Sequence, residues 1–424
     1  MEIQWIVRNC LTGITLLFLL YLILRKKQRE DMNWAMFYST LWVLLSLLTV
    51  NWICVELGLW SFNKEENLTI FIPFDLLFIW VVMWGILPFF ILKGSKLLIT
   101  AIALLWVDVI FMPYLEVYGI ITLEKYWLVG ELLMILLVFI PGYLWSKFSF
   151  THKHTGLRSL LQFICVAIIY CLGIPFITLT YFPVTLNFAA WYMPYVVQLG
   201  FIIAMPSIAA LIDLYVKGNG TPFPYDPTTK LVRTGVYSYI RNPIQWSLTF
   251  LFIPLAIFYS SPILLIGVVV SLAYTIGVSN PQEFASMEER FGEEWNKYKV
   301  AVPAWSFLWR PITIPVGIIY FKKECHSCSS IRSWFESRQP INLEFVYAED
   351  YEAGILQQVA YVDYRGQEVS SVKAIANALE HINLGWAVLG WFMRLPGINY
   401  VLQNIIDSMA IEESNSKCDR EIIY

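Results

Sequence analysis

Seven long apolar runs decide what this chain can fold into. A helix that crosses a bilayer needs roughly 20 predominantly apolar residues. Runs of about that length fall at residues 4–24, 34–58, 70–92, 97–116, 125–146, 157–181 and 187–215. The composition agrees, because 58% of the residues are hydrophobic and only 14% are charged. The sequence therefore predicts a polytopic α-helical membrane protein with about seven transmembrane helices.

Two shorter apolar runs follow, at residues 244–258 and 263–278, and Ser260, Ser261 and Pro262 separate them. At the rise of an α-helix, each run spans only about 22–24 Å. A bilayer core is roughly 30 Å thick. We therefore expect a short helical hairpin that barely crosses the membrane, or two re-entrant arms.

Basic residues gather in every second loop between the runs. Lys and Arg follow the first, third, fifth and seventh runs, whereas the loops between are poor in them. The positive-inside rule then places the N-terminus outside and residues 216–243 and 279–424 in the cytoplasm. The basic cluster after the first run is typical of a reverse signal anchor and not of a cleaved signal peptide. The net charge of −3 argues against a nucleic-acid partner.

The composition becomes more polar after Pro311. A strand at 316–320, the C-x-x-C pair Cys325 and Cys328 at a helix start, and a second strand follow one another as in a thioredoxin-like domain. A helix N-terminus would stabilise a thiolate at Cys325. A zinc site needs four ligands, and the cysteines with His326 are too clustered to supply them. The pattern favours a redox pair with a thiol partner over a metal site.

Two motifs flank the hairpin. The first comprises Gly235, Tyr237, Tyr239, Arg241, Asn242 and Pro243, and the second comprises Glu283, Met287, Phe291, Gly292, Trp295, Tyr298, Val302, Pro303 and Trp305. With the hairpin between them, they resemble the isoprenylcysteine carboxyl methyltransferase and phospholipid methyltransferase family over about residues 185–310. Three positions depart from the family pattern. Asn242 replaces the usual His, Gln245 a common Tyr, and Phe284 the second Glu of a pair.

This resemblance implies S-adenosylmethionine as cofactor, held in a pocket that the C-terminal segment closes, and a lipid substrate that enters from the membrane. It implies cofactor contacts from Tyr237, Tyr239, Arg241, Asn242, Pro243, Glu283, Trp295 and Tyr298. The chemistry suits such a ligand, because Arg241 can hold a carboxylate with a forked contact and Glu283 can pair with an amino group. An aromatic ring such as Trp246 can stack on adenine or face the sulfonium. Arg241 and Glu283 are therefore the candidate catalytic residues.

Carboxyl groups also occur within the first apolar runs. Asp75 and Glu116 lie near run ends, where an interfacial position is expected. Asp108 and Glu131 lie deeper, and intramembrane acids usually face a cavity or a partner. We assign these two to a candidate substrate cavity, together with Gln245 and Trp246. Short motifs within residues 1–150, such as IPFDLLFIW and VDVIFMPYLEVYG, faintly resemble lycopene cyclase and carotenoid-biosynthesis domains, which implies an isoprenoid ligand.

The segment from about 314 to 410 resembles the DCC family of predicted thiol-disulfide oxidoreductases, through VDYRGQEVSSVKAIANAL and WFMRLPGINYVLQNIIDSMA. This resemblance makes Cys325 and Cys328 the candidate catalytic pair. No proline stands just before VAYVD, where thioredoxins place a cis-proline. Run 383–410 is apolar, but Arg394 and Pro396 in its middle favour a pair of helices over a further membrane span.

The predicted organisation has four parts. They are a transmembrane bundle at 1–182, a methyltransferase-like membrane domain at 183–310 with the hairpin 244–278, a cytoplasmic thioredoxin-like α/β domain at 311–412 and a polar tail at 413–424. The stretch GTPFPYDP resembles bacterial family members, so we expect a bacterial inner membrane. Three functions stay open. They are methylation of an isoprenoid or phospholipid-like acceptor, thiol-disulfide exchange at the cysteine pair, and non-catalytic lipid binding.

Overall fold

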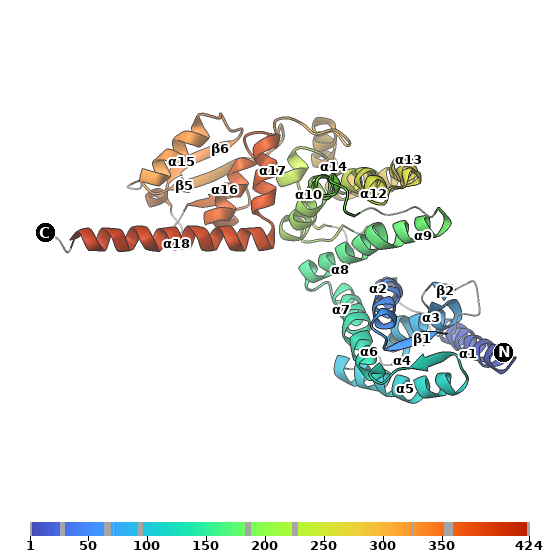
Figure 1. Ribbon diagram of the computed structural model, residues 1–424. Coiled ribbons are helices and arrows are strands. Elements are labelled where there is room, and N and C mark those ends of the chain that lie inside the picture. The colour runs from blue at the N-terminus through green and yellow to red at the C-terminus, as the bar shows by residue number, and fades with distance from the viewer. Residues whose placement is uncertain are drawn as a thin grey trace. The chain divides into compact units, whose positions relative to one another are not determined.

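The computed structural model describes residues 2–25, 30–62, 69–70, 72–91, 96–182, 188–222, 228–323, 326–351 and 359–421. The chain forms two compact units, Met1–Ile174 and Pro175–Tyr424 (Figure 1). Cys325 lies outside the described residues.

The first unit is a helical bundle. Its elements are α1 (Glu2–Arg25), α2 (Glu30–Glu56), β1 (Trp60–Phe62), β2 (Thr69–Ile70), β3 (Ile72–Pro73), α3 (Phe74–Val81), η1 (Val82–Ile86), α4 (Leu87–Ile91), α5 (Leu97–Val117), β4 (Ile121–Leu123), α6 (Trp127–Met134), η2 (Ile135–Phe139), α7 (Ile140–Phe150), α8 (Thr155–Ile168) and η3 (Ile169–Gly173). Strand β1 pairs with β4 in an antiparallel ribbon, and β2 pairs with β3. The segments η1, η2 and η3 are single π-helical turns inside longer helices.

Six helices in the described part of the chain are long and apolar enough to cross a membrane: Ile3–Tyr21, Trp34–Glu56, Leu97–Val117, Trp127–Phe150, Thr155–Tyr181 and Met193–Gly218. The run expected at 70–92 gives only the shorter apolar helix Phe74–Phe89. The ribbon of β2 and β3 takes the beginning of that run, and Pro73, which has no N–H to donate, stands at the helix start. The expected count of about seven full spans is therefore not confirmed.

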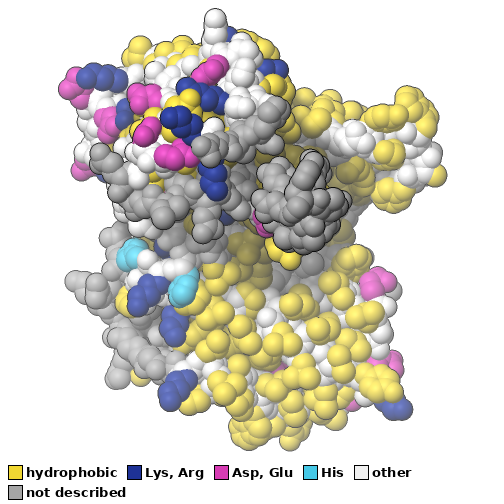
Figure 2. Space-filling view, turned by 90° about the vertical axis from the view of Figure 1, so that its left-hand side faces the viewer, with side chains coloured by type: hydrophobic (Ala, Val, Ile, Leu, Met, Phe, Trp, Pro, Cys, Tyr) yellow, Lys and Arg dark blue, Asp and Glu magenta, His cyan; other side chains and the backbone are white. Residues whose placement is uncertain are grey.

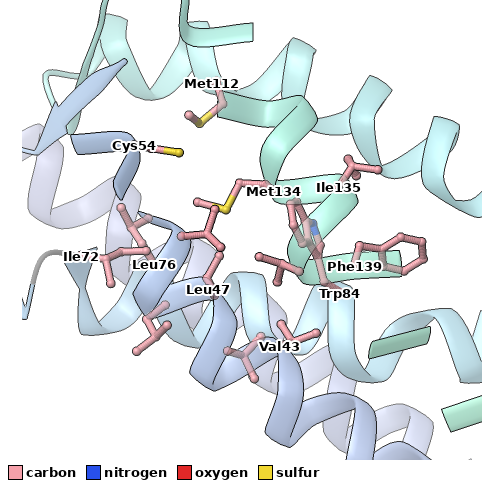
Figure 3. Close-up of a cluster of buried hydrophobic side chains, with 14 of the residues drawn as sticks. Val43, Leu47, Cys54, Ile72, Leu76, Trp84, Met112, Met134, Ile135 and Phe139 are labelled. Carbon is pink, nitrogen blue, oxygen red and sulfur yellow. The ribbon is translucent and has the colours of Figure 1, made fainter. Parts of the chain in front are cut away.

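A large apolar cluster fills much of the interior of this unit, and Figure 3 shows part of it. Side chains from α2, α3, η1, α5 and the continuous helix α6–η2–α7 contribute to it, and Val43, Trp84 and Phe139 are each at most 2% exposed. Large apolar side chains on the outer faces of α1 and α5 stay exposed, for example Leu17 at 69%. Such faces suit contact with lipid, where apolar side chains need no protein partner.

The second unit begins with the helices of the hairpin region. They are α9 (Ile174–Tyr181, entering from the first unit), α10 (Met193–Gly218), η4 (Gly235–Ser238), α11 (Pro243–Phe250), α12 (Phe252–Phe258), η5 (Pro262–Leu265), α13 (Ile266–Tyr274), η6 (Thr275–Ser279) and α14 (Asn280–Ala301). The apolar helices Pro243–Phe258 and Pro262–Gly277 are the two arms of the expected hairpin. Ser260, at φ 50°, lies in the turn that reverses the chain between them.

The C-terminal part of this unit carries a four-stranded sheet. Its elements are β5 (Gly317–Phe321), α15 (His326–Glu336), β6 (Leu343–Tyr347), η7 (Ala348–Asp350), β7 (Ala360–Val362), β8 (Glu368–Ser370), α16 (Ser371–Leu379), α17 (Leu384–Met393) and α18 (Pro396–Glu421). The strand order is β6-β5-β7-β8. Strands β5 and β6 are parallel, and the other two pairs are antiparallel. The apolar run 383–410 is divided into α17 and α18 at Arg394, as its sequence predicts.

Charged and apolar side chains cover different regions of the surface. Figure 2 shows Lys, Arg, Asp and Glu side chains gathered over one region and hydrophobic side chains over most of another. The second unit carries ion pairs on its surface, such as Lys297 with Glu293 and Arg332 with Glu336. The long apolar helices support an integral membrane protein, and the sheet belongs to a C-terminal domain of the second unit.

Candidate functional site

The motif before the hairpin folds into one short turn and the start of a helix. Residues 235–238 form the 3-10 turn η4, and α11 begins at Pro243. Proline suits this first helical position because its missing N–H would have no partner there. The side-chain amide of Asn242 donates to Oδ1 of Asn280 at 3.1 Å. Asn242 therefore ties the entry of the hairpin to the residue that follows it.

Arg241 lies against the helix that follows the hairpin. Its backbone N–H donates to the carbonyl of Pro303 at 2.9 Å, and Nη1 donates to the carbonyl of Lys299 at 2.6 Å. The guanidinium faces two rings, those of Phe284 at 5.2 Å and Trp295 at 5.8 Å. Cation–π contacts of this kind contribute about 0.5–2 kcal/mol each. Both motifs therefore meet at Arg241.

Glu283 stands in the first turn of α14, beside this cluster. Burial raises the pKa of its carboxyl, and the charge of Arg241 acts in the opposite direction. Among the described residues no ion pair joins the two side chains, although each feels the charge of the other. A cation and an acid held near each other without a direct bond form a suitable pair of contacts for a zwitterion.

The aromatic residues of the second motif pack beside Arg241 and Glu283. Trp295 and Tyr298 are at most 3% exposed and pack against each other at 5.8 Å between ring centroids. The hydroxyl of Tyr298 donates to the carbonyl of Tyr237 at 2.8 Å. Burial raises the pKa of the Tyr298 hydroxyl, so it stays a donor at neutral pH. These contacts place Tyr237, Arg241, Glu283, Trp295 and Tyr298 in one cluster.

Two buried donors of this cluster have no hydrogen-bond partner within the part of the chain described. They are Nε of Arg241 and Nε1 of Trp295. A buried donor without an acceptor costs about 1–3 kcal/mol. Unpaired donors are therefore expected where a ligand supplies the acceptor.

Two other candidates, Tyr239 and Trp246, make their contacts outside this cluster. The hydroxyl of Tyr239 donates to the carbonyl of Glu380 at 2.8 Å, and its ring packs edge-on against Trp391. Trp246 packs on Phe250 and Phe307, with ring centroids about 5 Å apart. Gln245 is half-buried on the same helix. Tyr239 and Trp246 therefore face the protein interior and not the cluster around Arg241.

Residues 195–294 match the phospholipid methyltransferase family. The matched segment runs from α10 through the first motif and the hairpin into α14, so it includes Arg241 and Glu283 but ends just before Trp295. No curated protein and no solved structure matches the chain. The match supports a membrane methyltransferase family for this segment, which is less than a quarter of the 424 residues.

The first unit holds the other acidic candidates. Asp108 is 3% exposed and Glu131 4%, and they are close enough to interact electrostatically. Nε1 of Trp80 donates to Oδ1 of Asp108 at 3.3 Å, while Oδ2 has no hydrogen-bond partner among the residues described. Asp108 lines a cavity of about 160 Å³, and Glu131 lines a smaller one of about 20 Å³. Trp80 and Met112 line both.

Asp108 and Glu131 belong to the first unit, whereas Gln245 and Trp246 belong to the second. The four residues of the substrate cavity expected from the sequence therefore belong to different units, and a cavity shared by all four stays a prediction. Asp108 and Glu131 line the two cavities described above.

The cysteine pair is described only in part. Cys328 is 9% exposed, is disulfide-bonded and packs in the apolar cluster of the sheet with Phe335 and Leu379. Cys325 lies outside the described residues. No cis peptide bond occurs in the described ranges.

Sequence reasoning missed a buried charge cluster near the first motif. Asp213 of α10 is fully buried and pairs with Lys217 and Arg394, both at 2.8 Å. Arg394 also pairs with Glu380 at 2.5 Å. Asp213 stands inside an apolar run, as Asp108 does, and this signal was available in the sequence. The pairing of Asp213 with Arg394 could not be foreseen from the sequence, because 181 positions separate the two residues.

Proposed function

We propose that residues 183–310 form a membrane-embedded methyltransferase that uses S-adenosylmethionine and acts on a lipophilic acceptor, isoprenoid or phospholipid-like. The observation that carries the proposal is the meeting of two motifs at Arg241, beside Glu283 and with two unsatisfied donors. The family match over 195–294 supports the same class.

The residues present fit the cofactor. It carries a carboxylate, an ammonium and a sulfonium, and it supplies a methyl group that a nucleophile can accept. Arg241 is the group for the carboxylate, since its Nε lacks an acceptor. Glu283 is the group for the ammonium. The rings of Phe284 and Trp295 offer π faces to a cation.

The chain's own residues would act mainly by holding and aligning. Bonds from Arg241 to Lys299 and from Tyr298 to Tyr237 fix the first motif against α14. The Asn242–Asn280 bond fixes the two ends of the hairpin. Alignment of reactants can lower a barrier by roughly 7–11 kcal/mol. A rigid junction at the base of a lipid-facing hairpin suits that role.

Binding of S-adenosylhomocysteine to the full chain in lipid nanodiscs, measured by calorimetry, tests the proposal. Glu283→Gln should weaken binding at least tenfold, about 1.4 kcal/mol. Glu293→Gln is the matched control, because Glu293 lies on the same helix in an exposed pair with Lys297. Absence of binding heat for the unmodified chain would reject the methyltransferase.

The pH dependence of this binding gives a second check. An ammonium needs the ionised form of Glu283, and burial raises the pKa of that carboxyl. Affinity should therefore fall as the pH is lowered towards this pKa. In the Glu283→Gln variant, affinity should change little over the same range.

We also propose a ligand site in the first unit. Its support is the unpartnered carboxylate oxygen of Asp108 on a cavity of about 160 Å³, lined mostly by apolar side chains of α1, α3 and α5. An apolar lipid tail with a polar or cationic group suits that lining. Mass spectrometry can identify the lipids that co-purify with the chain. One lipid species should be depleted in Asp108→Leu but not in the lipid-facing control Leu17→Ala. Identical lipid profiles would reject the site.

For the C-terminal domain we propose a thioredoxin-like fold and, as an alternative function, thiol-disulfide exchange. The strand order β6-β5-β7-β8, with one parallel pair and the helix α15 between its strands, supports that fold. Titration of the thiols against glutathione tests the exchange, and an unreactive pair would reject it. We place this domain in the cytoplasm of a bacterial cell and the N-terminus outside the inner membrane, from the loop charges.

A further inference from the structure

A closed circuit of buried contacts links the first motif to the C-terminal domain. Asp213 of α10 accepts from the backbone N–H of Val236 at 3.2 Å, and it pairs with Arg394. Arg394 pairs with Glu380, whose carbonyl accepts from the hydroxyl of Tyr239. The path therefore leaves the motif at Val236 and returns to it three residues later.

The circuit is buried and balanced in charge. Asp213, Glu380 and Arg394 have side chains that are at most 9% exposed, and Lys217 contributes the second cation. Buried ions are tolerated when they are paired, and removal of one partner leaves an uncompensated charge. Two acids and two bases here leave no excess charge.

Backbone geometry shows how closely the motif fits the circuit. Gly235 has φ 69°, and a Cβ atom there would lie 1.9 Å from Oδ2 of Asp213. Only glycine suits this position, because it takes positive φ without strain and leaves room for the carboxylate. The backbone of the turn η4 therefore packs directly against the carboxylate of Asp213.

An apolar cluster surrounds the ions. Val236, Tyr239 and Ile240 of the motif are fully buried against Ala387 and Trp391 of α17. The amide of Leu308 donates to the carbonyl of Tyr239 at 2.9 Å. Helix α17 therefore covers one side of the motif while α14 covers the side that carries Arg241.

We propose that Arg394 is a positioning residue for residues 235–241, so that the C-terminal domain is a working part of the methyltransferase site. This inference rests on the proposed methyltransferase function. Arg394 touches no cofactor atom in the proposal; it holds Asp213 and Glu380, and these hold the turn that places Arg241.

Hydrogen exchange of the full chain in nanodiscs tests the positioning independently of any ligand. In Arg394→Gln, amides of residues 236–240 should exchange at least tenfold faster, while amides of β5 keep their protection. Arg394→Lys should show a smaller rise, since it keeps the charge but loses the forked geometry. The control Arg332→Gln breaks an exposed pair in the same domain and should change neither region.

Two further variants keep the test decisive if Arg394→Gln fails to fold. Tyr239→Phe removes only the hydroxyl that donates to Glu380, and a rise of about threefold in exchange of the turn is expected. Asp213→Asn combined with Arg394→Gln restores charge balance and should recover part of the protection. Equal loss of protection in the turn and in β5, or no change in either, would overturn the positioning role.

Calorimetry then separates the two ideas. Arg394→Gln should weaken S-adenosylhomocysteine binding at least tenfold, and Arg394→Lys should restore part of it. If the unmodified chain binds no cofactor, the proposed function fails while the exchange data still decide whether Arg394 holds the turn. If cofactor binds equally to all variants, the methyltransferase stands and the positioning role fails.

Discussion

Acidification should destabilise the C-terminal domain through His381. This side chain is fully buried after α16. Its Nδ1 lies 2.7 Å from the carbonyl of Ile341, and its Nε2 lies 2.9 Å from the hydroxyl of Tyr361. A carbonyl can only accept, so Nδ1 carries the proton and Nε2 accepts from Tyr361. The geometry therefore fits the neutral imidazole.

The size of the effect follows from the pKa. Burial lowers the pKa of His381 from 6.5 to about 4. The unfolded chain thus binds the proton more readily, and stability present above pH 6.5 is lost as the pH falls towards 4. Between pH 7.5 and pH 5.0 the linkage relation gives a loss of about 2 kcal/mol, or roughly a thirtyfold change in the opening equilibrium.

Hydrogen exchange at the two pH values, corrected for intrinsic rates, measures this loss. The amide of Ile341, which donates to the carbonyl of His381, and the amides of α16 report on it. The variant His381→Asn can still donate to Ile341 but has nothing to protonate, so its pH dependence should be smaller by that amount. Glu380 is present in both proteins, so its own titration contributes to both pH profiles. Equal pH dependence in both proteins would refute the reasoning.

Three substitutions test other parts of the structure. Gly235→Ala should lower the free energy of unfolding by about 1–3 kcal/mol, because the added Cβ would overlap Asp213. The control Gly366→Ala also lies at a positive φ but in open space, so a thermal melt should show a smaller loss of stability. Phe139→Ala, fully buried in the first unit, should cost about 3 kcal/mol, against little change for its exposed neighbour Leu136→Ala. Arg8→Gln breaks the two 2.7 Å bonds to Asp75, and spin-label distances between α1 and α3 should broaden, with a cost of about 1 kcal/mol because the pair is partly exposed.

Much of the membrane part could be predicted from the sequence because it depends on local composition. Length and hydropathy fix a membrane helix without knowledge of its neighbours, so six of the expected runs appear as long helices. The shortening at 70–92 was harder to foresee, since it depends on the pairing of β2 with β3. The four π-helical turns in the described ranges, η1, η2, η3 and η6, have no composition signal of their own.

The residues of the candidate site could be predicted from the sequence only in part. The two motifs that flank the hairpin predicted Arg241, Glu283, Trp295 and Tyr298, which the structure gathers in one cluster. Spacing could not reveal that Tyr239 turns away from it, because successive residues of a tight turn face different neighbours. The pairing of Asp213 with Arg394 depends on how α17 packs, and no local pattern encodes that contact.

Phe284 gives the sharpest consequence of this arrangement. Its ring lies 5.2 Å from the guanidinium of Arg241 and 5.9 Å from the ring of Trp295. S-adenosylmethionine carries one more positive charge than S-adenosylhomocysteine, and a neutral ring distinguishes the two only weakly. In Phe284→Glu the new carboxylate would compete for Arg241, which weakens both ligands alike, but only S-adenosylmethionine offers it a sulfonium to attract.

That extra attraction is about 1–3 kcal/mol at the effective dielectric of a partly buried site. The ratio of the two dissociation constants should therefore shift towards S-adenosylmethionine by roughly tenfold or more. Phe284→Leu removes the ring without adding charge, and it should leave the ratio within about threefold of that of the unmodified chain because the cation–π contribution is small. If both variants shift the ratio equally, shape and not charge governs the choice between the two ligands, and the rings of Phe284 and Trp295 do not face the ligand's sulfonium.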